Sequence, residues 1–144
     1  MSSNRRTRGF SLVEIMIVIV IMGLLAGVVA VNVRSYLIKA KQNAARQDIA
    51  VIDHALDTFW SEYGRFPTQE EGLAILAKPT DKFPEPLLKD VPIDPWGRPY
   101  VYVPPTGNGP YDVICLGADG KEGGTGQDAD ISSSTLRKPK SESP

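Results

Sequence analysis

The feature that most constrains this chain is an apolar run near its N-terminus. No side chain from Ile15 to Val31 is charged or able to form a hydrogen bond. The stretch from Phe10 to Val31 holds about 22 residues, which makes about 33 Å of helix at 1.5 Å per residue. This length matches the hydrocarbon core of a bilayer, about 30 Å thick. A cleavable secretory signal has a shorter apolar core followed by a small-residue cleavage site. The run therefore predicts a membrane-spanning helix that stays in the mature chain.

A single acidic residue, Glu14, lies at the start of this run. A charge at the centre of a spanning helix costs about 2.5–3.5 kcal/mol on insertion scales, and less near the interface. One interpretation is that Glu14 is shallow and reaches the headgroups. The other is that it pairs with a cation: cleavage between Gly9 and Phe10 would create a positive α-amino group four residues away. Pairing between staggered neighbouring helices would then fix their axial offset, as buried charges do in other assemblies.

Residues 8–16, Arg-Gly-Phe-Ser-Leu-Val-Glu-Ile-Met, resemble the class III signal of type IV pilins and type II secretion pseudopilins. The resemblance implies that a prepilin peptidase cuts after Gly9 and N-methylates Phe10, and that Glu14 is required for assembly. Basic residues flank the span on both sides, so charge alone does not decide its orientation. The resemblance places the N-terminus in the cytoplasm and the rest of a single-pass inner-membrane protein in the periplasm.

Charge and cysteine content bear on two questions: whether the chain binds nucleic acid, and whether it is a pilin or a pseudopilin. The formal net charge is −1, and loss of the three arginines that precede Gly9 would lower it by three, which argues against nucleic acid as a partner. The single cysteine, Cys115, excludes an intrachain disulfide and is predicted to be buried in a strand. Many type IV pilins close a C-terminal loop with a disulfide, so its absence favours a pseudopilin.

The helical pattern continues beyond the membrane. Apolar residues recur at three- and four-residue spacing, which predicts one buried stripe: Ala45, Ile49, Ile52, Leu56, Phe59 and Tyr63. No proline occurs between Phe10 and Arg65, and Gly64 is a typical helix stop. The sequence therefore predicts one helix that continues to about residue 63. The family often has a proline about 22 residues into the mature helix, where this chain has Val31.

The remaining sequence predicts a small α+β head. A capping box at 68–71 opens a short helix over 72–77, and 94–97, Asp-Pro-Trp-Gly, predicts a tight turn. Two apolar stretches, 99–103 and 111–116, flank a glycine-rich turn and predict a β-hairpin, part of a small antiparallel sheet. The segments around 63–73 and 94–97 resemble the major pseudopilin. We thus expect a cleaved leader (1–9), a transmembrane and polymerisation helix (10–32), a periplasmic domain (33–131) and a disordered tail (132–144).

A glycine-rich loop after the second strand carries the candidate metal ligands. Asp119, Asp128 and Asp130 are oxygen ligands of the kind that calcium prefers, but their spacing is not that of an EF-hand, so the residues alone favour solvated turns over a metal site. The resemblance implies a calcium site that uses the Leu116 carbonyl, Asp119 and the acids before Ile131, with the Gln127 carbonyl as a further donor. The family often has two adjacent acids there; this chain has Asp-Ala-Asp, which leaves open whether Asp128 or Asp130 binds.

These features favour a structural protein that does no covalent chemistry. The resemblance implies the major subunit of a type II secretion pseudopilus, a homopolymer that drives protein export across the outer membrane. Its implied partners are minor pseudopilins, the prepilin peptidase and an inner-membrane assembly platform. One alternative is a type IV pilin for adhesion, motility or DNA uptake. Another is a membrane-tethered periplasmic enzyme, for which the sequence offers one histidine, His54, and no set of base and nucleophile.

Overall fold

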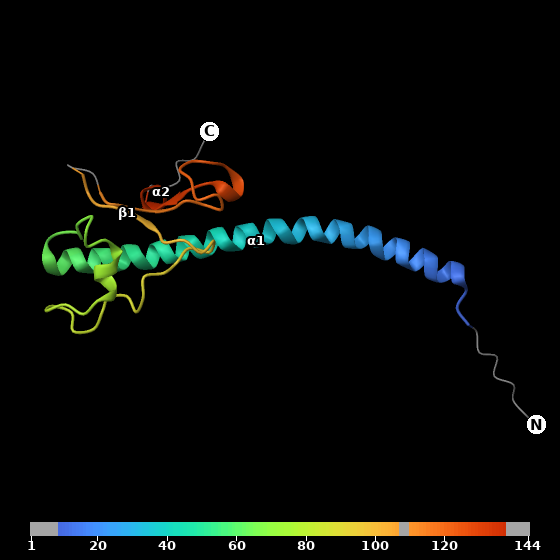
Figure 1. Cartoon of the computed structure of the whole chain (residues 1–144), viewed down its shortest axis with the longest axis horizontal. Coiled ribbons are helices and arrows are strands. Elements are labelled where there is room, and N and C mark those ends of the chain that lie inside the picture. Colours follow the sequence, from blue (N-terminus) through green and yellow to red (C-terminus); the bar gives the residue numbers. More distant parts are fainter. Residues whose placement is uncertain (1–8, 107–109, 138–144) are drawn as a thin grey trace, which may run out of the picture. The chain divides into compact units, whose positions relative to one another are not determined.

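A computed structural model describes residues 9–106 and 110–137 (Figure 1). Helix α1 runs from Leu12 to Tyr63 without interruption and passes through position 31. It ends as predicted: Gly64 has a φ of +66° and donates its N–H to the Trp60 carbonyl at 2.8 Å. The chain divides into two compact units, Met1–Leu37 and Ile38–Pro144, and each is described by itself.

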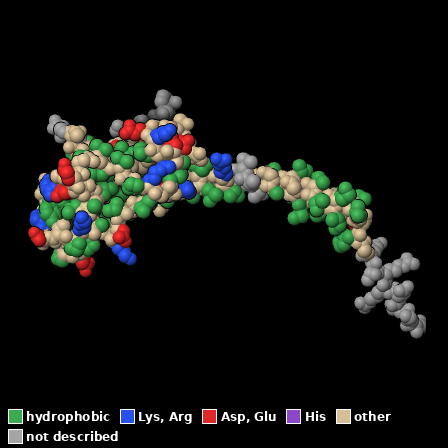
Figure 2. Space-filling view, viewed as in Figure 1, with side chains coloured by type: hydrophobic (Ala, Val, Ile, Leu, Met, Phe, Trp, Pro, Cys, Tyr) green, Lys and Arg blue, Asp and Glu red, His purple; other side chains and the backbone are tan. Residues whose placement is uncertain are grey.

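The first unit contains the apolar part of α1. This helix is long and apolar enough to cross a membrane, and its apolar window is not buried inside the protein. Figure 2 shows apolar side chains along the visible face of this segment. A helix that is apolar all round needs lipid or other helices around it, so its surface is suited to a bilayer and to packing against further copies.

The second unit has a core built on the predicted helical stripe. Ala45, Ile49, Ile52, Leu56 and Phe59 are buried, and each is at most 2% exposed. Burying an apolar side chain of this size stabilises a fold by about 1.5–3 kcal/mol relative to its exposed state. The stripe therefore attaches the C-terminal half of α1 to the head.

The predicted capping-box hydrogen bonds form after α1, but they close a turn over 69–72 and do not cap the next helix, whose N-cap residue is Gly72 and has no side-chain cap bond. The Thr68 N–H donates to Glu71 Oε2 at 2.8 Å, and the Glu71 N–H donates to Thr68 Oγ1 at 3.2 Å. These reciprocal bonds are those of a capping box. The short helix that follows, η1 (Leu73–Ala77), is a 3₁₀ helix, and it buries Leu73 and Leu76 against α1 and the sheet.

The sheet has three short antiparallel strands in the order β1-β2-β3: β1 (Val101–Val103), β2 (Asp112–Cys115) and β3 (Ile131–Ser132). Tyr102 lies opposite Val113, and both side chains are buried, which confirms the predicted hairpin. The turn predicted at 107–109 lies outside the described residues. Strand β3 was not predicted, because two residues are too short to show a period.

The prediction of a disordered tail from residue 132 is wrong for its first part. Ser132 belongs to β3, and Ser133–Arg137 form a short helix, α2. Ser133 is fully buried, and its hydroxyl donates to Asp112 Oδ1 at 2.8 Å. The segment is ordered by polar contacts rather than by apolar burial, and composition does not show such contacts. Residues 138–144 lie outside the described part.

Candidate functional site

The first candidate site is the start of α1, where Glu14 closes a capping box that the sequence analysis missed. The Ser11 N–H donates to Glu14 Oε2 at 3.1 Å, and the Val13 N–H donates to Ser11 Oγ at 3.3 Å. Ser followed three residues later by Glu is the signal that could have revealed it. The carboxylate is thus held by its own helix in the single chain. Gly9 and Phe10 precede α1, and both are exposed.

The second candidate region begins at the predicted tight turn, which is built around Asp94. This carboxylate is buried, and its Oδ1 accepts the N–H groups of Trp96 and Arg98, each at 2.9 Å. The Gly97 N–H donates to the Asp94 carbonyl at 2.9 Å, and the Asp94 N–H donates to the Arg98 carbonyl at 2.8 Å. Hydrogen bonds to both the N–H and the carbonyl of Asp94 therefore close the turn, which confirms the tight turn predicted at 94–97.

Cys115 connects this turn to β2. Its thiol lies 3.6 Å from Asp94 Oδ2, to which it donates a hydrogen bond. Burial raises the pKa of this thiol to about 11, so the thiolate that would be the nucleophile does not form near neutral pH. Cys115 is 1% exposed, as predicted for a packing residue.

The C-terminal loop leaves β2 at Leu116 and returns at Ile131. Its first turn is closed by the Gly120 N–H, which donates to the Leu116 carbonyl at 3.2 Å. The Ala118 N–H donates to the Gln127 carbonyl at 3.0 Å and ties the two sides of the loop together. The carbonyls of Leu116 and Gln127, two of the predicted donors, therefore each accept a backbone N–H within the loop.

The three acids of the loop differ in their surroundings. Asp119 Oδ1 accepts the Lys121 N–H at 3.1 Å, and Asp130 Oδ2 accepts the Gly123 N–H at 2.8 Å. The half-buried Asp128 carboxylate accepts no hydrogen bond and forms no ion pair with any residue that the structure describes.

The backbone of Asp128 is enclosed by two glycines. A Cβ on Gly117 would lie 2.7 Å from the Asp128 carbonyl oxygen, and a Cβ on Gly124 would lie 2.5 Å from it. Both glycines also have positive φ values, +62° and +90°. These positions accept only glycine without a shift of the backbone.

The donors of this loop fit calcium in kind, because all of them are oxygens. Within 9–106 and 110–137, however, no three acidic, histidine or cysteine side chains converge into a group that could hold a metal. A cation at this loop would therefore depend on backbone carbonyls as much as on carboxylates. The carbonyls of Leu116 and Gln127 each accept one N–H in the structure and keep a second lone pair.

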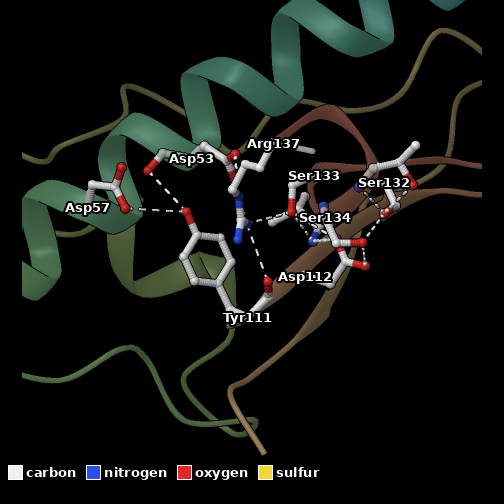
Figure 3. A network of polar contacts seen from close by, with 10 residues as sticks. Asp53, Asp57, Tyr111, Asp112, Ser132, Ser133, Ser134 and Arg137 are labelled. Carbon is white, nitrogen blue, oxygen red and sulfur yellow. Dashed lines mark hydrogen bonds and ion pairs between the residues drawn. The ribbon is translucent and has the colours of Figure 1, made fainter. Parts of the chain in front are cut away.

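A third group of polar contacts fastens α2 to α1 (Figure 3). The Arg137 guanidinium donates to both Asp53 oxygens at 3.3 and 3.4 Å, to the Tyr111 carbonyl at 3.3 Å and to Ser133 Oγ at 2.7 Å. It also lies 4.2 Å from the centre of the Tyr111 ring. The sequence analysis did not predict this cluster, because its members are far apart along the chain.

Asp112, on β2, anchors the other side of the same cluster. It accepts the Ser134 N–H at 3.0 Å and the hydroxyls of Ser133 and Ser134 at 2.8 and 2.9 Å. Burial alone would raise the pKa of Asp112, but these hydrogen bonds together hold it below its ordinary value. The carboxylate therefore stays ionised and orders the residues after β3.

His54 lines a shallow cleft of about 470 Å³ between α1 and the residues before the tight turn. Its neighbours there include Val51, Leu87 and Leu88, and the lining is mainly apolar. The one polar neighbour on the helix, Thr58, donates its hydroxyl to the His54 carbonyl at 2.9 Å. This hydroxyl is thus hydrogen-bonded to the helix backbone and is not paired with the imidazole, as a nucleophile would be.

Comparison with known proteins matches both parts of the chain. Residues 32–134 match the family model "Type II secretion system (T2SS), protein G", and residues 4–30 match the prokaryotic N-terminal methylation motif. Two relatives named type II secretion system core protein G are similar along most of their length. That of Pseudomonas aeruginosa is 44% identical and covers 89% of this chain and 95% of the relative. That of Vibrio cholerae is 42% identical and covers 91% and 94%.

A solved structure is also similar. It is the crystal structure of the major pseudopilin from the type 2 secretion system of enterohaemorrhagic Escherichia coli. The match has a TM-score of 0.56 and 28% sequence identity, and it covers 70% of this chain and 90% of the solved chain.

Proposed function

This chain belongs to the type II secretion system protein G family, and on this basis we propose that it is the major structural subunit of a secretion pseudopilus. The observation that carries the proposal is the family match over residues 32–134, joined to an N-terminal methylation motif at 4–30. Its role is structural: copies polymerise into a periplasmic filament, and growth of this filament drives protein export across the outer membrane. Energy for growth comes from other components.

Before assembly, the subunit is held in the inner membrane by the apolar part of α1, with its head in the periplasm. The prepilin peptidase removes residues 1–9 and methylates the new N-terminus at Phe10. Assembly then involves further copies, minor pseudopilins and the inner-membrane platform. The exposure of Gly9 and Phe10, which precede α1, supports access by the peptidase.

In the filament, Glu14 pairs with the α-amino group of Phe10 on a neighbouring copy. The capping bond to the Ser11 N–H supports this role, because it uses Glu14 Oε2 only. The Oε1 atom has no hydrogen-bond partner among the described residues and remains available to a neighbour. A carboxylate in an apolar surrounding gains most from a charged partner. Its own helix provides a hydrogen bond to only one carboxylate oxygen of Glu14, and packing against a neighbouring copy would provide a partner for the other.

The test is co-expression of the full chain with a prepilin peptidase, followed by mass spectrometry of the N-terminus and electron microscopy of filaments. We expect cleavage between Gly9 and Phe10 and filament formation. Glu14→Gln should be cleaved as efficiently and form no filaments, whereas the control Glu62→Gln, an exposed acid near the other end of α1, should assemble normally. An intact Met1 or normal filaments from Glu14→Gln would contradict the proposal.

We further propose that the C-terminal loop binds one structural calcium ion. The Leu116 carbonyl, Asp119 and Asp128 or Asp130 would hold it, with the Gln127 carbonyl as a further donor. Bound calcium would supply a positive charge, and oxygen ligands from both ends of the loop would coordinate it, which would join the ends of a loop too polar and glycine-rich to form a core. The unpartnered Asp128 carboxylate supports this assignment.

The calcium proposal is tested by the melting temperature of calcium-loaded protein before and after addition of a chelator. We expect chelation to lower the melting temperature, and Asp119→Asn to remove most of this difference. The control Asp90→Asn changes an exposed acid outside the loop and should keep the difference. An unchanged melting temperature after chelation would contradict the site.

A further inference from the structure

We infer that Arg98 is a positioning residue for the calcium loop: its guanidinium holds residues 117 and 118, and it thereby positions the proposed donors on either side of them, the Leu116 carbonyl and the Asp119 carboxylate. The inference rests on the calcium site proposed above and extends it to a residue outside the loop. Arg98 Nη1 donates to the Gly117 carbonyl at 2.9 Å, and Nη2 donates to the Ala118 carbonyl at 2.6 Å.

The pairing of Arg98 with two successive carbonyls is specific. The guanidinium presents its N–H groups in a rigid fork, which a lysine ammonium does not have. Hydrogen bonds from a charged donor are about twice as strong as neutral ones. The two ion pairs in the described ranges involve Arg65 and Arg137, so Arg98 directs its charge at these carbonyls and not at a carboxylate within 4.0 Å.

The backbone that carries Arg98 is itself fixed. Asp94 accepts the Arg98 N–H and donates its own N–H to the Arg98 carbonyl. The Asp94 carboxylate in turn accepts a hydrogen bond from the thiol of Cys115, the last residue of β2 before the loop. The side chain of Arg98 therefore starts from a rigid turn that is attached to the strand from which the loop leaves.

Arg98 binds some of the loop carbonyls and leaves the proposed calcium donors unbound. The carbonyls of Gly117 and Ala118 point to Arg98, while the neighbouring donors, the Leu116 carbonyl and the Asp119 carboxylate, are not used by it. Gly120 packs directly on the guanidinium: a Cβ there would lie 2.6 Å from Arg98 Nη1. Arg98 thus holds the turn whose two ends carry proposed calcium ligands.

The experiment compares full-length wild type, Arg98→Ala and Arg98→Lys in detergent micelles. It measures hydrogen exchange in the calcium-free protein and calcium affinity by titration calorimetry. In Arg98→Ala, exchange at the Ala118 and Gly120 amides should be at least about 10-fold faster. Outer-shell partners of metal ligands typically contribute about 10–100-fold in affinity, so the calcium Kd should rise by a factor in this range. Arg98→Lys should recover less than half of either loss, because it keeps the charge but not the fork.

The control is Arg65→Ala, which removes another guanidinium that donates to a backbone carbonyl, that of Phe66, and to the Glu71 carboxylate, both outside the loop. It should leave the exchange of the loop amides and the calcium Kd unchanged. Exchange and Kd within twofold of wild type in Arg98→Ala would overturn the inference, as would equal losses in Arg65→Ala. If wild type itself binds no calcium, the metal site of the proposed function fails, and the exchange data alone decide whether Arg98 orders the loop.

Discussion

Replacement of Arg137 by alanine gives the most direct test of how the C-terminal segment is held. The guanidinium forms an ion pair with Asp53 whose side chains are 34% and 19% exposed, so the pair is worth about 0.5–1 kcal/mol. Its position 4.2 Å from the Tyr111 ring adds about 0.5–1 kcal/mol. The hydrogen bonds to Ser133 and to the Tyr111 carbonyl contribute about 1 kcal/mol each. We expect Arg137→Ala to cost about 2–3 kcal/mol, because such contributions are not fully additive.

Two assays on the full chain in micelles measure this loss. Urea unfolding, monitored by tryptophan fluorescence, gives the free energy of unfolding, and thermal unfolding gives the melting temperature. A loss of this size should lower the melting temperature by about 10–20 °C for a head of this size. Asp53→Asn removes the ion pair alone and should cost about 1 kcal/mol or less. The control Arg46→Ala removes one exposed hydrogen bond to Asn43 and should lie within about 0.5 kcal/mol of wild type. Equal losses in Arg137→Ala and Asp53→Asn would refute the reasoning, since Arg137 would then act through the ion pair only.

Two further predictions concern the turn after α1 and the loop glycines. Hydrogen bonds from Arg65 and from the Thr68 N–H lower the pKa of Glu71 from 4.5 to about 2, so their contribution to stability is present above pH 4.5 and lost as the pH falls toward 2. Urea unfolding at several pH values should show a flatter acid limb for Glu71→Gln, and an unchanged slope would contradict this. Gly124→Ala adds a Cβ 2.5 Å from the Asp128 carbonyl oxygen and should cost at least about 1 kcal/mol more than Gly126→Ala. Gly126 has a φ of +63° but free space around its Cβ position, so equal melting temperatures of the two variants would refute the steric argument.

The elements that could be predicted from the sequence are those whose signals lie within a few residues. The buried stripe of α1, the stop at Gly64 and the capping box at 68–71 all follow from 3.6-residue geometry and local hydrogen bonds. The turn at 94–97 follows from proline and glycine at set positions. The capping box of Ser11 and Glu14 carried the same kind of signal and could have been predicted too.

Only the tertiary structure decided the contacts that shape the C-terminal region. Arg98 lies about 20 residues from the carbonyls it holds, and Arg137 lies 84 residues from Asp53. The order of residues 132–137 depends on Asp112, which composition does not connect to them. Periodicity and turn chemistry report the face and bend of one segment, because they arise from bonds between near neighbours. Which distant polar groups meet depends on the path of the whole backbone, and that path is set by burial of the core.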